Sequence, residues 1–595
     1  MYNKFQLKYI ILILVSILVF SCEEYLDKTI EAEVTEEDVF TTFFNYQGYV
    51  ETGYAQIIDR GFNPWEAPYF NWGDDVVHAS RNRLLQEGDY WPVVNGQTRE
   101  CVYRNMPQFN IYVAGQAISQ GRGIWDNSWH GIRIANIALE HLDDLVDATP
   151  EERAVLEGQS LFFRGYFHWE IMKQWGGIPY IDQALKPADE MKLPALNFHE
   201  AADKVILDLR NASELLPVDW DDHPAGQRTL GNNRGRLTKG IALAVLTEVQ
   251  LYSGSPLMNG AATGTYDYNH EYLTNAANTA WEVLQLANQG VYSLEPFETY
   301  GNLFKSVGQA NQEPGVSKEN IFRPPYYGMY SKYHVDQWVP RRVGGRSHFE
   351  SPSQNLIEKF ETINGLPIDD PESGFDPANP WENLDPRFYY NIYKDGDPIS
   401  ISMPLNAEMY TGGSERRAGQ SVTGYGMKKY IHVTWNNFDG GWNGGMGFHT
   451  VPLIRLAEIY LFYAEAVNEV YGPHGTAPGA DLTAVDAVNI IRNRAGMPDV
   501  HSKFTGSKEA FRERIRNERA VELAFESKRR DDLRRWYVAH ETRHKELYGL
   551  DFPRDHSFFE KRVVKTIVFD LKHYWFPFPT DQVLLYEGWN QNPGW

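Results

Sequence analysis

The segment His540–His544 has the spacing used by zinc hydrolases, two histidines four positions apart with a glutamate after the first. On a continuous helix both imidazoles would share one face and bind zinc, and the glutamate could activate a water. The surroundings oppose this chemistry, because the segment is polar and Arg543 would place a cation beside the metal. No third ligand follows at short spacing. We therefore expect an exposed helix end here.

Carboxylates on the C-terminal helices could form the acid–base pair of a glycosidase. Each lies near an arginine, however, which is typical of ion pairs between helices. We expect an architectural role for the acids Glu458, Glu465, Glu518, Glu522 and Glu526 and for the bases Arg455, Arg492, Arg519 and Arg534. The serines form no nucleophile elbow, and no Walker-type glycine loop is present. The sequence therefore predicts no catalytic residue.

Asp74 and Asp75 could contribute to a calcium site. Calcium takes six or more oxygen ligands, and two adjacent carboxylates supply few of them. We expect neither a metal ion nor an organic cofactor.

The N-terminus predicts export and lipid attachment. Lys4 and Lys8 precede an apolar run from Tyr9 to Phe20, which has the length of a signal-peptide core. It leads into Ser21-Cys22, which is similar to a bacterial lipobox, in which the cysteine is acylated. We expect a signal peptide over 1–21, lipid on Cys22 and a tether over 22–45. Several acyl chains would anchor the protein firmly to a membrane.

The formal net charge is -23, which argues against nucleic acid as a partner, because such binding depends on Lys and Arg neutralising phosphates. If Cys22 carries lipid, Cys101 is unpaired, so no disulfide is expected to hold the fold. At 595 residues with 42% hydrophobic content, the chain can bury a large core.

Helical signals dominate residues 46–300. Thr149-Pro150-Glu151-Glu152 is a capping box with proline at the first helical position, and this helix should stop at Gly176-Gly177. Further helices are expected over 238–254 and 272–287. Paired helices of this size suggest tetratricopeptide-like units, although no regular repeat period can be aligned.

The amino-acid composition changes at 301–450, where Gly, Pro, Asn and aromatic residues become frequent and the helical periodicity is lost. Helices return at 453–467, 484–494 and 508–536, and an irregular aromatic tail follows from Tyr574 to Trp595. We expect a mostly α fold, in which a tetratricopeptide-like scaffold carries a loop-rich, aromatic-rich insert. The second half, 301–595, would hold the insert and the returning helices.

A set of motifs in order along the chain resembles the SusD/RagB family. They are Leu161–Phe167 with Gln174–Tyr180, Gly235–Gly240, Ser351–Ser353 with Asp385–Phe388, Arg455–Glu458 with Tyr463–Ala466, Arg492–Gly496, Glu518–Glu526, Arg530–Trp536 and the ending Gln591–Trp595. The resemblance implies a non-enzymatic surface lipoprotein of the outer membrane. Such proteins bind oligosaccharides or polysaccharides and form the lid of a SusC-like TonB-dependent transporter.

The resemblance also implies a binding site made by loops in two regions, without a local motif. The chain has 17 Trp and 35 Tyr, flat rings that can stack on pyranose faces while polar groups bind the hydroxyls. From the first region we select Asp75, Arg81, Trp91 and Asn95, and from the second Tyr326, Tyr327, Trp338, Trp435 and Trp442. Each aromatic residue could instead belong to a core. The acidic balance favours neutral polymers such as β-glucans.

Two other functions stay open at this stage. The chain could be a transporter lid or scaffold that binds peptide or another nutrient, or a surface hydrolase. Retardation by polysaccharides without turnover separates the glycan-binding hypothesis from both.

Overall fold

The computed structural model describes residues 36–58, 73–78, 84–95, 111–113, 116–118, 123–187, 193–305, 316–324, 338–345, 350–400, 403–417, 420–431, 438, 449–585 and 589–595. The predicted signal peptide, Cys22 and most of the tether lie outside these residues. The helices of the first half are α2 (Glu36–Phe40), α3 (Phe43–Glu51), α4 (Trp91–Val94), α5 (Ile124–Glu140), α6 (Pro150–Trp175), α7 (Phe198–Leu215), α8 (Pro224–Arg228), α9 (Lys239–Ser253), α10 (Pro256–Thr263) and α11 (His270–Asn288).

The second half contains α13 (Gln354–Ile357), α14 (Pro386–Asn391), α16 (Leu456–Tyr471), α17 (Ala484–Arg494), α18 (Lys508–Glu522), α19 (Arg529–Arg535), α20 (Thr542–Lys545) and α21 (Thr580–Leu585). The strands pair two by two, all antiparallel: β1 (Val76–His78) with β5 (Glu350–Pro352), β2 (Ile111–Val113) with β3 (Gln116–Ile118), β4 (Asn320–Phe322) with β8 (Ile454–Arg455), β6 (Ile392–Tyr393) with β7 (Gly426–Met427), and β9 (Glu546–Asp551) with β10 (Glu560–Thr566).

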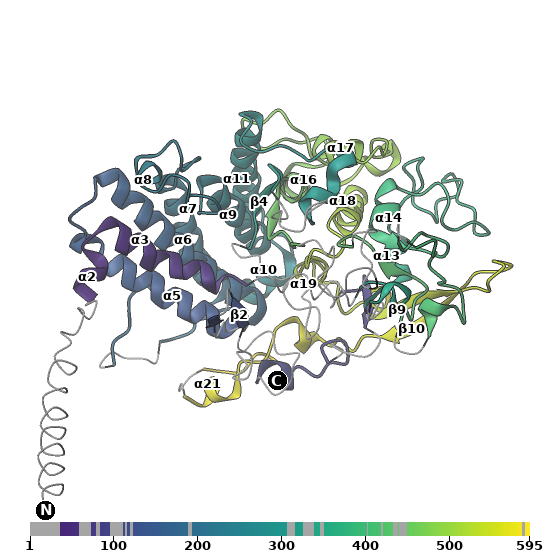
Figure 1. The fold of residues 1–595 in the computed structure, drawn as a ribbon, viewed down its shortest axis with the longest axis horizontal. Coiled ribbons are helices and arrows are strands. Elements are labelled where there is room, and N and C mark those ends of the chain that lie inside the picture. The colour runs from purple at the N-terminus through teal and green to yellow at the C-terminus, as the bar shows by residue number, and fades with distance from the viewer. Residues whose placement is uncertain are drawn as a thin grey trace, which may run out of the picture.

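The long helices pack in series, each against the next, from α5 through α6, α7, α9 and α11 to α16 and then α17 and α18 (Figure 1). Helix α11 packs directly on α16, although the whole insert lies between them in the sequence. This helical scaffold with an insert of short elements confirms the predicted fold class.

Helix α6 shows how local sequence signals set the scaffold. Thr149 accepts from the backbone of Glu152, whose carboxylate accepts in return from the backbone of Thr149, so both predicted halves of the capping box are present. The helix ends at Gly176, whose φ of 87° favours glycine. A Cβ on Gly177 would lie 2.2 Å from the carbonyl oxygen of Leu196, so a larger residue would displace that backbone.

Two parts of the C-terminal region differ from the prediction. The expected helix over 508–536 is interrupted, because α18 ends at Glu522 and α19 begins at Arg529. Phe525 and Ser527 have φ values of 64° and 63°, which a helix cannot contain. The hairpin β9–β10 was not predicted, since β10 is mostly exposed and polar and lacks a clear alternation of apolar residues.

The interruption lies beside a buried network of ion pairs. Arg455 binds Glu319, Glu522 and Glu526, with N–O distances of 2.7, 2.7 and 2.8 Å. The other pairs are Arg387–Glu518, Arg492–Glu518, Arg494–Glu319, Arg519–Glu458, Arg535–Glu465 and Lys429–Glu526. The ion pairs expected among the charged residues of the C-terminal helices are therefore present, and Glu319, Arg387, Lys429 and Arg494 join them.

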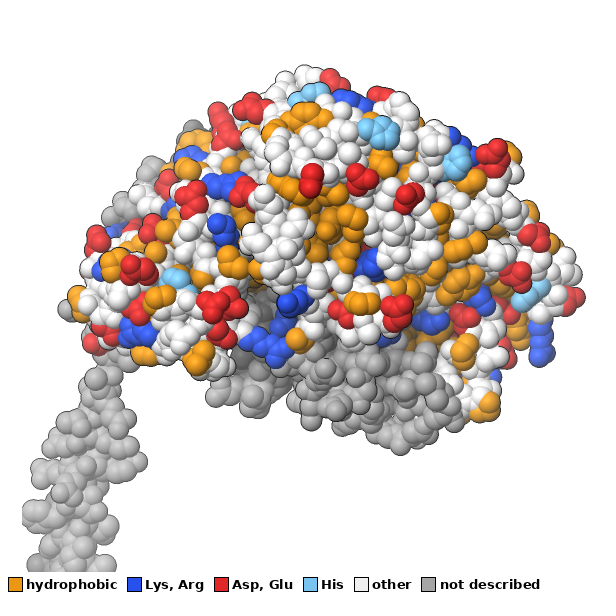
Figure 2. All heavy atoms as spheres, turned by 90° about the horizontal axis from the view of Figure 1, so that it is seen from above, with side chains coloured by type: hydrophobic (Ala, Val, Ile, Leu, Met, Phe, Trp, Pro, Cys, Tyr) orange, Lys and Arg blue, Asp and Glu red, His pale blue; other side chains and the backbone are white. Residues whose placement is uncertain are grey.

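Figure 2 shows one face of the molecule, on which acidic and basic side chains are interspersed. Within the part of the chain that the structure describes, no helix has both the length and the apolar character needed to cross a membrane.

Candidate functional site

Four of the described residues that border the predicted binding segments come together through Glu350 and the ring of Trp338. His78, Trp338, Tyr430 and His449 each lie at or next to the edge of a segment that carries candidate residues. In the β1–β5 pair His78 lies opposite Glu350, whose carboxylate accepts from the indole nitrogen of Trp338 at 2.9 Å. The ring of Trp338 lies 5.4 Å from that of Tyr430 and 5.6 Å from that of His449. We call these five residues the loop base.

The structure makes Trp338 part of this base. Its side chain is 0% exposed and belongs to the core cluster of the insert, so in this structure it has no surface to stack on a ligand. Arg81, Tyr326, Tyr327, Trp435 and Trp442 lie outside the described residues, and their contact with a ligand stays a prediction.

Asp75 lies in the segment that leads to His78 of the loop base, and its neighbour Asp74 is held by the guanidinium of Arg529 and the imidazole of His544. Arg529 Nε lies 2.6 Å from one oxygen of Asp74, and His544 Nδ1 lies 2.6 Å from the other. Burial alone would raise the pKa of Asp74, but Arg529 and His544 lower it well below its usual range. Because both oxygens are used in these contacts, Asp74 is poorly suited to bind calcium.

The same contacts explain the zinc-like motif. Helix α20 is a single turn that begins after His540 and Glu541, so the two histidines do not share a continuous helix. His540 Nδ1 lies 2.6 Å from the hydroxyl of Tyr574, while His544 is buried against Asp74. The prediction of an exposed helix end is therefore wrong for His544. Within the described residues, no group of three or more His, Cys, Asp and Glu could hold a metal ion.

The buried Asp75 gives a stability prediction that depends on pH. Burial, followed by the charge of Asp74, raises the pKa of Asp75 to about 7, with Arg529 opposing them. A raised pKa means that the folded protein holds a proton which the unfolded chain releases near pH 4, so Asp75 lowers stability as pH rises from about 4 to 8. We expect Asp75→Asn to stabilise the protein by about 3 kcal/mol at pH 8 and hardly at pH 4.

Urea unfolding of both proteins at the two pH values measures this difference. Asp74→Asn is the matched control and should destabilise the protein at pH 8, because it removes the partner of Arg529 and His544. Equal effects of Asp75→Asn at both pH values would contradict the prediction.

Trp91 and Asn95 lie beside the C-terminal tail. The indole of Trp91 packs edge-on to Trp595 with ring centres 5.9 Å apart, and Asn95 Nδ2 donates to Thr580 Oγ1 at 3.4 Å. Both side chains are partly exposed. The structure therefore leaves these two predicted residues accessible.

A cavity of about 420 Å³ is lined on one side by the same tail. Three indoles, Trp125, Trp129 and Trp589, contribute to its walls together with Asn136 and Gln582. Rings beside amide groups are the combination that a sugar requires, one for stacking and the other for hydroxyl groups. We call this the Trp cavity. Its residues were not selected from the sequence, because they come from α5, from residues 179–193 and from the tail, which are far apart in the chain.

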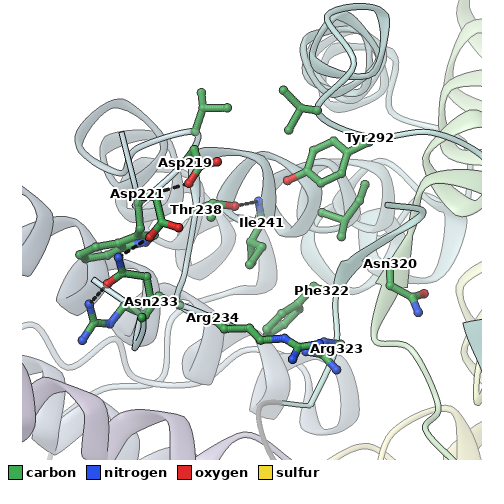
Figure 3. A pocket seen from close by; sticks show the side chains of 17 residues that line it. Asp219, Asp221, Asn233, Arg234, Thr238, Ile241, Tyr292, Asn320, Phe322 and Arg323 are labelled. Carbon is green, nitrogen blue, oxygen red and sulfur yellow. Dashed lines mark hydrogen bonds between the residues drawn. The ribbon is translucent and has the colours of Figure 1, made fainter. Parts of the chain in front are cut away.

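A second cavity, of about 470 Å³, opens between the start of α9 and β4. Figure 3 shows Arg234 and Arg323 pointing toward each other along one side and the hydroxyl of Tyr292 pointing inward. Gly235, Arg236 and Thr238 also line it, so part of the motif noted at 235–240 forms a cavity wall.

The fold defines a class of protein, a helical-repeat scaffold with a loop-bearing insert. Two family models match the chain: one described as "SusD family" over residues 318–595 and one described as "Starch-binding associating with outer membrane" over residues 95–231. The chain belongs to the SusD/RagB family.

Relatives and solved structures agree with this assignment. SusD-like protein P2 of Formosa agariphila is 24% identical, with 91% of this chain and 92% of the relative covered. A SusD-like protein from Bacteroides fragilis has the same fold with a TM-score of 0.71 at 23% identity, covering 95% of this chain and 99% of the other. A structure titled a SusD-like carbohydrate binding protein, also from Bacteroides fragilis, matches with a TM-score of 0.62 at 19% identity, covering 92% and 99%.

Proposed function

We propose that this chain is a glycan-binding lipoprotein of the outer membrane, anchored through Cys22 and facing the cell surface. It captures oligosaccharides or polysaccharides and passes them to a SusC-like TonB-dependent transporter, which it covers as a lid. The observation that carries the proposal is the loop base, since four described segments that border the candidate residues meet there. The match to a family model described as starch-binding, and the similarity to a SusD-like carbohydrate binding protein, support glycan as the ligand.

The proposed mechanism is capture without chemistry. Rigid aromatic rings stack on sugar faces, and polar groups fixed by the scaffold bind hydroxyls at a small entropic cost. Neutral sugars exchange hydrogen bonds with water for hydrogen bonds with protein, so each site contributes little. Several contacts on one polymer, held close to the transporter, make this weak binding sufficient.

Affinity electrophoresis of the full-length protein across a panel of polysaccharides tests the proposal. We expect at least one polysaccharide to retard the protein without being hydrolysed. Trp435→Ala, Trp442→Ala and Trp91→Ala should each reduce the retardation several-fold, because loss of a stacked ring costs about 1 kcal/mol or more. Tyr471→Ala is the control, since this 39% exposed aromatic residue ends α16, away from the candidate segments.

If all three tryptophan variants are retarded as strongly as wild type, the proposed location of the binding site is wrong. Trp129→Ala then shows whether the Trp cavity binds the polymer instead. If no polysaccharide retards the protein at all, the lid or scaffold that binds peptide or another nutrient becomes the better hypothesis. The transporter partnership is tested separately, by co-purification from outer membranes with wild-type protein and with a Cys22→Ala variant.

A further inference from the structure

A small pocket next to Asp74 is lined mainly by basic side chains, although the protein as a whole is strongly acidic. It has a volume of about 40 Å³ and is lined from the end of α13, from α18, from α19 and from α20. Its lining includes five Lys or Arg side chains but only one carboxylate: Lys359, Arg514, Arg516, Arg529 and Arg543 against Glu513. We call this the basic pocket.

Lys359 forms no ion pair with any described residue, although its side chain is partly buried. Burial, and then the nearby guanidinium of Arg529, lowers the pKa of its ammonium group, while the carboxylates of Asp74 and Glu513 oppose this shift without reversing it. The backbone oxygen of Lys359 accepts from Asn517 at 2.9 Å, which fixes the backbone of this lysine at the pocket. Partial burial of a cation that forms no ion pair is costly, so an anion bound here would be stabilising.

The arginines supply further donors. Arg514 Nη1 binds Glu361 at 3.0 Å and Arg516 Nη1 binds Glu513 at 2.9 Å, but the Nε atom of each arginine is buried and has no acceptor among the described residues. Arg529 is already paired with Asp74. Two unpaired N–H groups and one unpaired ammonium group therefore belong to residues that line one pocket.

The carboxylates nearby are shared, which leaves positive charge in excess. The four arginines of the pocket are paired with four carboxylates, Asp74, Glu361, Glu513 and Glu541, and Lys359 forms no ion pair with any described residue. Glu361 also binds Arg492 at 2.9 Å, and Asp74 also contacts His544 at 2.6 Å.

The volume limits what could neutralise this charge. A cavity of about 40 Å³ has room for roughly three water molecules, since each needs about 10–15 Å³ of accessible space. A sugar ring is too large, whereas a tetrahedral oxyanion fits and offers several acceptor oxygens to the converging donors.

We propose that the basic pocket binds one small inorganic oxyanion, sulfate or phosphate, through Lys359, Arg514 and Arg516. The anion would lie close to Asp74, because Arg529 lines the basic pocket and also pairs with the carboxylate of Asp74. This inference does not depend on the proposed glycan function.

The test measures the thermal midpoint of the full-length protein at constant ionic strength, with chloride replaced stepwise by sulfate or by phosphate. We expect a saturable rise for one or both anions, as ligand binding to the folded state requires. Lys359→Met should abolish the saturable rise and raise the midpoint without anion, because it removes the unpaired charge. Lys359→Arg should keep the rise, and Lys318→Met, away from the pocket, should behave as wild type.

An equal rise in wild type and Lys359→Met would overturn the proposal, because exclusion of sulfate from the surface stabilises both proteins alike. Absence of any rise would overturn it as well. If Lys359→Met does not fold, calorimetric titration of wild type with sodium sulfate gives an independent result. One saturable site supports the proposal, and no heat beyond dilution opposes it.

Discussion

Replacing Glu522 with Gln should destabilise the protein by about 3–5 kcal/mol, because a buried charge network that loses one member leaves its partners uncompensated. Glu522 is 0% exposed and accepts from three guanidiniums: Arg387 at 2.9 Å, Arg455 at 2.7 Å and Arg494 at a shorter distance. Burial would raise the pKa of Glu522, but these three cations hold it well below its usual range. The carboxylate is therefore ionised, and glutamine cannot supply its charge.

Urea unfolding of wild type and Glu522→Gln measures the loss, and Glu282→Gln is the matched control. Glu282 also pairs with an arginine, Arg210 at 2.9 Å, but it is 38% exposed, so its loss should cost at most about 1 kcal/mol. If the two variants lose the same stability, the network does not determine the fold. The sign of the pH dependence also follows, since a lowered carboxylate pKa gives stability that is lost as pH falls through the acidic range.

This network explains why one part of the fold could be predicted and another could not. The ends of α6 follow from Thr149, Pro150 and Gly176, whose effects are local and can be identified within a few residues. The break after α18 depends instead on distant groups. The carbonyls of Ala524 and Phe525 accept from Lys429 Nζ and from the hydroxyl of Tyr430, at 2.9 Å each. Local sequence patterns do not predict hydrogen bonds with such distant residues.

The candidate site shows the same limit. A tryptophan in a loop-rich segment can be a ligand platform or a core residue, and sequence alone does not distinguish them. Trp338 is buried because Glu350, on β5, accepts from its indole and because Tyr430 and His449 pack on its ring. Trp91 remains partly exposed because only one edge meets Trp595. The basic pocket was missed for a related reason, since its charges come from four separate elements.

The last prediction concerns the ending Gln591–Trp595, whose side chains bind the C-terminal end of helix α6. Asn592 Nδ2 donates to the carbonyl of Trp175 at 2.9 Å and to that of Phe576 at 2.7 Å. The first of these carbonyls belongs to the last turn of α6, which has no partner within its own helix. Asn592 therefore caps a long scaffold helix from the far end of the chain.

Asn592→Ala should cost about 2–3 kcal/mol, because it leaves two buried carbonyls without a donor. Asn590→Ala, an exposed neighbour, should cost almost nothing. Removal of residues 591–595 should cost about 4–6 kcal/mol, because it also removes Trp595, which donates to the carbonyls of Lys572 and Trp575 at 3.0 Å each and packs on Tyr90. Thermal and urea unfolding of the three variants measure these losses.

The truncation should also affect ligand binding, since Trp595 is the ring against which Trp91 packs. We expect the truncated protein, at a temperature where it stays folded, to lose as much polysaccharide retardation as Trp91→Ala does. Asn592→Ala should lose stability while keeping most of the retardation, because it leaves Trp595 in the chain. Full retardation by the truncated protein would show that the tail stabilises the scaffold without shaping the binding surface.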